Sequence, residues 1–154
     1  ESGHDYLIIA DRYSGFPWIE RLHSTTSHAV INKFKRLFDD LSFLPQSIRT
    51  DNGPQFRTEF EDYCDTKGIA YEHSSPHYPR SNGHAESAVK SVKRLLEKCQ
   101  GKFNDEFFDR LRELRNHPRA DGFSPAQMLF GRRLKTALPV LPAAYEPIDT
   151  RRAG

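Results

Sequence analysis

The sequence predicts an α/β domain in which a mixed sheet is flanked by helices. Short apolar runs of strand length alternate with longer segments whose apolar residues recur at helical spacing. Their order is strand, strand, helix, strand, helix, strand, helix, helix, which is typical of a layered α/β fold. The 154 residues contain no internal repeat and suffice for one domain with a sizeable core.

The bulk composition excludes several classes of protein. No apolar run approaches the ~20 residues that a membrane span requires, so we expect no membrane partner. Two cysteines without a CxxC pair argue against a structural zinc site. The net charge of +2 is too small to indicate a nucleic-acid partner by itself. The first residues run almost at once into a strand without a signal-peptide pattern, which suggests a chain cut from a longer polypeptide.

The first predicted elements form a hairpin followed by a helix. The apolar run 6–10 reads as a buried strand, 11–15 as a turn and 17–22 as the second strand. From Thr26 the apolar residues recur at helical spacing, and either Thr26 or Ser27 can cap the helix.

A strand, helix, strand sequence follows. A short strand is expected at 47–50, with a turn at 51–54 directly after it. Thr58 and Glu61 have the spacing of a capping box that opens a short helix, which Gly68 closes. The next strand is expected at 69–73.

The last part of the core is helical. A loop over 74–83 leads into an amphipathic helix at about 84–99, and another helix covers 104–116. Ser124 with Gln127 signals a final short helix that ends at Gly131. We therefore predict a core domain over 1–131 and a proline-rich, partly extended tail over 132–154. The amphipathic helix is expected to bury Ala85, Ala88, Val89, Val92, Leu95, Leu96 and Cys99.

Two carboxylates stand in unusual settings. Asp51 follows a strand directly, where open α/β sheets place their ligands, and Glu86 lies at the start of the amphipathic helix. One helix and one strand separate them, about the chain needed to return to the same end of a sheet. Two neighbouring carboxylates repel unless a hard cation such as Mg²⁺ joins them, and paired ions of this kind serve phosphodiester chemistry. The alternative is a plain Asp-Asn-Gly turn and a glutamate that favours the helix dipole.

Lys90 and Lys93 help to decide between a metal site and an ordinary turn and helix start. They follow Glu86 at +4 and +7, on the same helix face. Cations there could hold a nucleic-acid strand beside a metal site. The alternative is an ion pair between Glu86 and Lys90, which stabilises a helix by only ~0.2–0.5 kcal/mol.

These residues resemble a known family. TDNGPQF (50–56) with SPHYPRSNGHAE (75–86) is similar to the second and third acidic segments of the retroviral and retrotransposon integrase catalytic core. YLIIADRYSGFPWIERL (6–22) and SPAQMLFGRRLKTALP (124–139) resemble the gypsy-class LTR elements. The resemblance implies a ribonuclease H-like fold. It also implies 3′-end processing and strand transfer of element DNA into target DNA, dependent on Mg²⁺ or Mn²⁺.

The resemblance also assigns roles to single residues. Asp51 and Glu86 would be the catalytic metal ligands, and Lys90 and Lys93 would contact DNA. The loop 75–83 would be a mobile loop over the site. By analogy the protein would form a homo-oligomer, bind element ends and target DNA, and act in the nucleus. The loop's nucleic-acid-binding residues would be His77, Arg80 and Asn82.

The sequence departs from the family pattern in one important respect. The family's first acid lies on a central strand upstream of the segment that resembles 6–15, so that strand and that metal ligand are expected to be absent here. Asp11 could replace the ligand or could simply cap its turn. Three interpretations stay open: an integrase core, whole or as a fragment; an inactive or host-retained module that binds nucleic acid; and a nuclease of the same fold.

Overall fold

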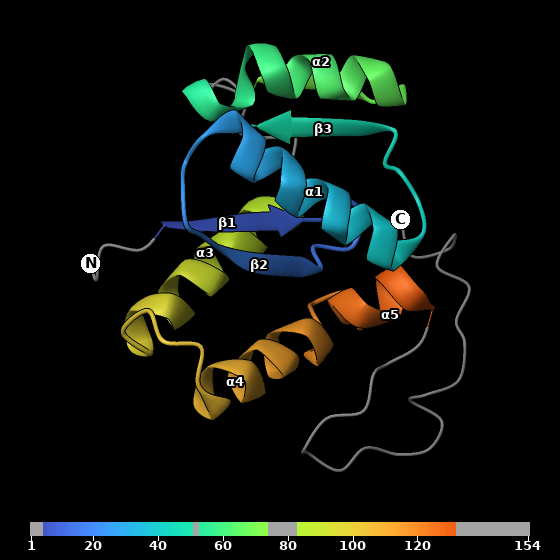
Figure 1. Ribbon diagram of the computed structural model, residues 1–154. Helices are drawn as coiled ribbons and strands as arrows, with labels where there is room; N and C mark the ends of the chain where they lie inside the picture. The colour runs from blue at the N-terminus through green and yellow to red at the C-terminus, as the bar shows by residue number, and fades with distance from the viewer. Residues whose placement is uncertain (1–4, 51–52, 74–82, 132–154) are drawn as a thin grey trace. The chain divides into compact units, whose positions relative to one another are not determined.

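The computed structural model describes residues 5–50, 53–73 and 83–131. They fall into two compact units, which are described separately. The first, here called the three-helix unit, contains residues 8–19 and 83–131. The second, here called the parallel-strand unit, contains residues 5–7, 20–50 and 53–73. Figure 1 labels the elements of both.

The chain begins with the predicted hairpin. Strand β1 (Asp5–Ala10) pairs with β2 (Pro17–Leu22). The six-residue connection between them is too short for a parallel crossover, so the pair is antiparallel. The backbone N–H of Asp11 donates to the carbonyl of Phe16 at 3.0 Å, and this bond closes the connecting turn.

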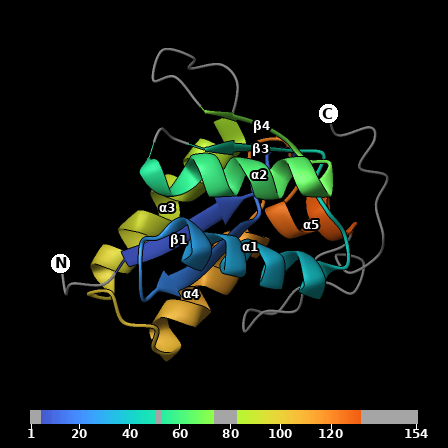
Figure 2. The same ribbon diagram turned by 45° about the horizontal axis from the view of Figure 1, so that its top comes forward.

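Two parallel strands and two helices make up most of the parallel-strand unit. Strand β3 (Ser47–Thr50) pairs with β4 (Ala70–His73) in register from Ser47 opposite Ala70 to Thr50 opposite His73. Helix α1 (Ser27–Leu41) is capped by the Thr26 side chain, which decides between the two caps that the sequence left open. Helix α2 (Thr58–Lys67) packs against α1 and β4, and Figure 2 shows it alongside the strand pair.

A cluster of aromatic rings forms the core of this unit. Phe60 of α2 is fully buried, and its ring centroid lies 5.4 Å from those of both Phe34 and Phe56. Phe56 belongs to a 3₁₀ turn, η1 (Pro54–Phe56), which the sequence analysis did not anticipate.

The capping box predicted at Thr58 and Glu61 is wrong. Helix α2 has Arg57 at its N-cap, and no side chain caps it. Because η1 runs almost directly into α2, Thr58 becomes the first helical residue. An N-cap residue has an extended backbone, which directs its side chain toward the free N–H groups of the first turn. Thr58 has a helical backbone instead, so its hydroxyl is not directed there.

The three-helix unit contains α3 (Gly83–Lys98), α4 (Asp105–Asn116) and α5 (Pro125–Phe130). Asn104 caps α4 by accepting the backbone N–H of Phe107 at 2.9 Å. The predicted capping box of Ser124 and Gln127 is present at α5, with both reciprocal hydrogen bonds formed.

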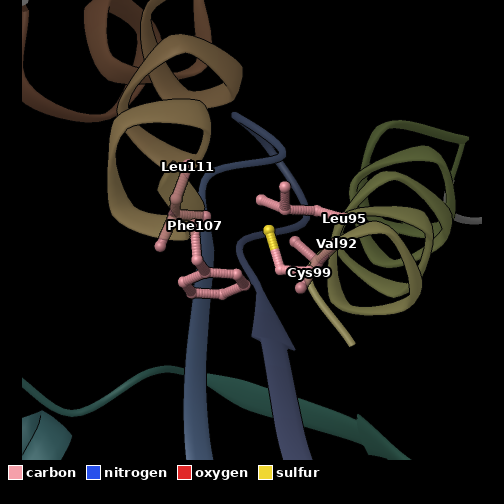
Figure 3. Close-up of a cluster of buried hydrophobic side chains, with 5 residues drawn as sticks. All are labelled: Val92, Leu95, Cys99, Phe107 and Leu111. Carbon is pink, nitrogen blue, oxygen red and sulfur yellow. The ribbon is translucent and has the colours of Figure 1, made fainter. Parts of the chain in front are cut away.

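The core of this unit lies where α3 meets α4. Figure 3 shows side chains of α3 directed toward those of α4. Ile8 and Ile19 of the hairpin pack against the same cluster. Of the predicted buried face of α3, Ala85, Val92, Leu95 and Cys99 are buried, whereas Ala88, Val89 and Leu96 are half-buried. The buried cluster consists of Val92, Leu95, Cys99, Phe107 and Leu111.

The mixed α/β class is confirmed, but in the described part of the chain the strands form two separate two-stranded sheets. The β1–β2 sheet is antiparallel and the β3–β4 sheet is parallel. The predicted tail 132–154 lies outside the described residues. No helix within the described ranges is long and apolar enough to cross a membrane.

We expect Phe107→Ala to lower the free energy of unfolding by about 3–5 kcal/mol, because the ring is fully buried between α3 and α4. Its neighbour provides the control: Phe108 is 40% exposed, so Phe108→Ala should cost about 1 kcal/mol for its aromatic contacts. Urea unfolding followed by circular dichroism measures both. Equal losses would contradict this description of the core.

Candidate metal and nucleic-acid site

Glu86 lies in the first turn of α3 with its side chain exposed. Among the described residues its carboxylate takes part in no ion pair, including the one considered with Lys90. Free carboxylate oxygens are the donors that Mg²⁺ and Mn²⁺ prefer. The helix-stabilising ion pair with Lys90 is therefore not formed, and the role of Glu86 as a metal ligand stays a prediction.

Lys90 and Lys93 are also exposed and lie one and two turns beyond Glu86 on the same face of α3. Neither forms an ion pair with an acid in the described ranges. Both ammonium groups are thus available to phosphate oxygens along the exposed face of the helix.

The other predicted site residues cannot be placed. Asp51, His77, Arg80 and Asn82 lie outside the described residues, so the predicted meeting of Asp51 with Glu86 stays a prediction. Within residues 5–50, 53–73 and 83–131, no three His, Cys, Asp or Glu side chains are grouped as a metal site.

Asp11 is engaged within its own turn. Its Oδ2 accepts the backbone N–H of Ser14 at 2.8 Å, and its carbonyl accepts that of Gly15 at 2.7 Å. These bonds support the turn-capping interpretation of Asp11 rather than that of a metal ligand.

Sequence reasoning missed a hydrogen-bonded network at the carboxyl ends of β3 and β4. The parallel register sets Thr50 opposite His73, and the Thr50 hydroxyl lies 2.9 Å from Nδ1 of the imidazole. Nε2 of His73 lies 2.8 Å from a carboxylate oxygen of Glu61 in α2. The network connects α2 through His73 of β4 to Thr50 of β3, the residue that precedes Asp51 in the sequence. Only the strand register, which the sequence does not display, could have revealed it.

The thiol of Cys64 is not suited to nucleophilic chemistry. Burial, followed by the nearby charges of Asp65 and Glu61, raises the pKa of this thiol to about 11. The thiol is therefore protonated at neutral pH, and a thiolate is the reactive form.

Comparison with known proteins gives a consistent result. A family model described as the integrase core domain matches residues 5–79. The Pro-Pol polyprotein of simian foamy virus type 3 is 28% identical over 131 residues, which are 81% of this chain and 11% of that protein. Residues 5–79 of this chain belong to the integrase core family.

A second curated relative matches a longer part of the chain. The integrase core described here is 30% identical over 141 residues to the uncharacterized protein K02A2.6 of Caenorhabditis elegans, covering 88% of this chain and 11% of that protein. The chain thus spans about a tenth of the length of the curated relatives that it matches.

Solved structures confirm the fold of this integrase core. The catalytic core domain of BIV integrase superposes with a TM-score of 0.67 at 22% identity, covering 84% of this chain and 87% of that one. A chain of the simian T-cell lymphotropic virus intasome, in complex with PP2A regulatory subunit B56 gamma, gives a TM-score of 0.66 at 23% identity. That match covers 90% of this chain and 52% of the other.

We expect Asp11→Asn to leave Mn²⁺ affinity unchanged, because the carboxylate of Asp11 serves its turn and an amide oxygen can still accept the Ser14 N–H. Asp11→Ala, which removes that acceptor, should lower the free energy of unfolding by about 1 kcal/mol. Titration calorimetry with Mn²⁺ and urea unfolding measure the two quantities. A tenfold or larger loss of Mn²⁺ affinity in Asp11→Asn would make Asp11 a metal ligand.

Proposed function

We propose that this integrase core is a metal-dependent polynucleotidyl transferase that performs DNA integration, through 3′-end processing and strand transfer. The observation that carries the proposal is the exposed carboxylate of Glu86 at the start of α3, which forms no ion pair with another described residue, together with Lys90 and Lys93 on the same helix face. Family membership supplies the reaction class, and this arrangement is what such a reaction requires of the chain itself.

In this proposal Glu86 and Asp51 hold Mg²⁺ or Mn²⁺. When bound, such an ion activates the attacking oxygen and stabilises the leaving oxygen of a phosphodiester. Lys90 and Lys93 hold the phosphates of the reacting strand beside Glu86, and His77, Arg80 and Asn82 add contacts from the preceding segment. Because α3 is a continuous helix, the backbone positions that carry the carboxylate and the two ammonium groups are set before DNA arrives.

We further propose that the partners are element ends and target DNA, that the protein acts as a homo-oligomer, and that it works in the nucleus. Membership of the integrase core family supports each of these statements. The exposed lysines of α3, Lys90 and Lys93, support the first.

One observation favours a second candidate function. Asp11, the acid that could have completed a set of three ligands, is bound by its own turn. A site with only Asp51 and Glu86 would bind metal weakly. A module that binds DNA without reacting with it is therefore the alternative, and it needs only the lysine face of α3.

We expect Glu86→Gln to lower strand transfer at least 100-fold with Mg²⁺ and a blunt-ended DNA substrate, because it removes a charged metal ligand. Glu97→Gln is the matched control, since Glu97 is an exposed glutamate on the same helix. The assay is run on this chain and on a longer polypeptide that includes sequence upstream of Glu1, with joined product read on a gel.

The outcomes separate the candidates. Joined product that depends on Glu86 supports the transferase, and cleavage without joining indicates a nuclease of the same fold. DNA binding without chemistry in either polypeptide indicates the binding module. Equal activity in Glu86→Gln and Glu97→Gln would refute the role given to Glu86.

We also expect the double variant Lys90→Ala, Lys93→Ala to bind duplex DNA with a weaker salt dependence. Each lost phosphate contact lowers the slope of log K against log salt by about 0.9, so the slope should fall by about 2. Fluorescence anisotropy at several salt concentrations measures the slope. Lys35→Ala, Lys67→Ala is the charge-matched control on α1 and α2, and it should retain the original slope. An unchanged slope in the α3 variant would contradict the proposed DNA face.

A further inference from the structure

The turn 11–16 meets the first turn of α3 at Gly15. Gly15 is buried and has a φ of +73°. A Cβ at this position would lie 3.1 Å from the carbonyl oxygen of His84 and 3.2 Å from its Cβ. The backbone of the hairpin turn and the start of α3 are therefore in contact, and a methyl group at Gly15 would push His84 away by a few tenths of an ångström.

Arg119, from the connection between α4 and α5, also packs against the turn at Ser14 and Gly15. Its Nη1 donates to the carbonyl of Ser14 at 2.6 Å and would lie 3.1 Å from the same Cβ. Nε and Nη2 of this guanidinium are buried and have no hydrogen-bond partner among the described residues. Burial lowers the pKa of Arg119, although the charge of Asp121 opposes that shift. Partial burial thus disfavours the charged form of Arg119, while its hydrogen bond to the Ser14 carbonyl holds the guanidinium against the turn.

The turn itself is held rigidly on its other side. Nε and Nη2 of Arg115 donate to the carbonyl of Pro17 at 3.0 and 2.8 Å, and the guanidinium lies 4.8 Å from the ring centroid of Phe16. Within the turn, the backbone N–H of Phe16 donates to the hydroxyl of Ser14 at 3.0 Å. Two arginines thus fix consecutive parts of one short turn.

The contact between the hairpin turn and α3 lies close to Glu86 in the sequence. The contact touches His84, two residues before Glu86 in the first turn of α3. The first turn of a helix has no backbone partners on its N-terminal side, so contacts from elsewhere determine how firmly it is held. We propose that Gly15 and Arg119 are positioning residues: the clamped turn 11–16 supports the first turn of α3 and so fixes Glu86 for metal binding.

This inference rests on the proposed function, since it concerns Glu86 as a metal ligand, but it makes a separate structural claim. Gly15→Ala should displace the backbone at His84, whereas Gly68→Ala should not. Gly68 has a nearly identical φ of +75° and has no atom within 4 Å of its added Cβ. The two variants therefore share the same backbone strain and differ in the clash with α3.

The experiment compares hydrogen exchange and Mn²⁺ binding in the whole chain. The amide of Ala88 donates to the carbonyl of His84 in an α-helix, so its exchange reports on the first turn. We expect Gly15→Ala to speed this exchange at least tenfold and to weaken Mn²⁺ binding 10- to 100-fold, as loss of a supporting contact does at metal sites. Gly68→Ala should match the unaltered chain in both measurements.

Arg119 supplies a second pair of variants in case Gly15→Ala does not fold. Arg119→Met removes the donor to Ser14 and should have the same two effects, whereas Arg119→Lys keeps a donor and should restore most of the original behaviour. Urea midpoints confirm that each protein is folded.

The two proposals fail in different ways. If Ala88 exchanges equally in the Gly15→Ala and Gly68→Ala proteins, the positioning role is overturned whatever the metal result. If Glu86→Gln binds Mn²⁺ as well as the unaltered chain does, the role of Glu86 fails, while the exchange data still decide whether the turn supports α3.

Discussion

The arrangement of the three-helix unit depends on burial of the apolar face of α3 against α4 and the hairpin. Val92 and Leu95 meet Phe107 and Leu111 there, with Ile8 and Ile19 packed on the same cluster. Burying side chains of this size removes enough apolar area from water to determine how α3 is rotated about its axis. That rotation exposes the opposite face of the helix, which carries Glu86, Lys90 and Lys93. The core thus fixes which side chains are available to a metal ion and to DNA.

Some charged groups of the candidate site are exposed and barely affect the stability of the fold, whereas others are partly buried and oppose it. An exposed carboxylate and two exposed ammonium groups on a helix surface place little demand on the fold. The two arginines beside the hairpin turn are different, because burial disfavours their charged form and two Arg119 nitrogens have no hydrogen-bond partner in the described part of the chain. Proteins commonly retain such unfavourable groups near functional sites, where geometry matters more than stability. Here the two partly buried arginines, Arg115 and Arg119, hydrogen-bond to the turn that contacts the start of α3.

Local sequence patterns predicted most of the secondary structure. Strand β2 has the predicted bounds, and Thr26 and Ser124 cap the helices expected of them. The failure at Thr58 is instructive: the capping box was recognisable in the sequence, but the neighbouring 3₁₀ turn shifted the N-cap to Arg57. The network of Thr50, His73 and Glu61 was not predictable, because it depends on the register between two strands that α2 separates in the chain.

The sequence by itself determined the order of the elements, the amphipathic character of α3 and the identity of the residues on its polar face. These properties follow from patterns that span at most a few turns of helix or one strand. Only the tertiary structure decided that the carboxylate of Asp11 serves its own turn, that Glu86 forms no ion pair with Lys90, and that Arg119 bonds to a carbonyl 105 residues away. Contacts of that kind depend on how packed surfaces bring distant segments together, and no local pattern of residues encodes that distance or direction.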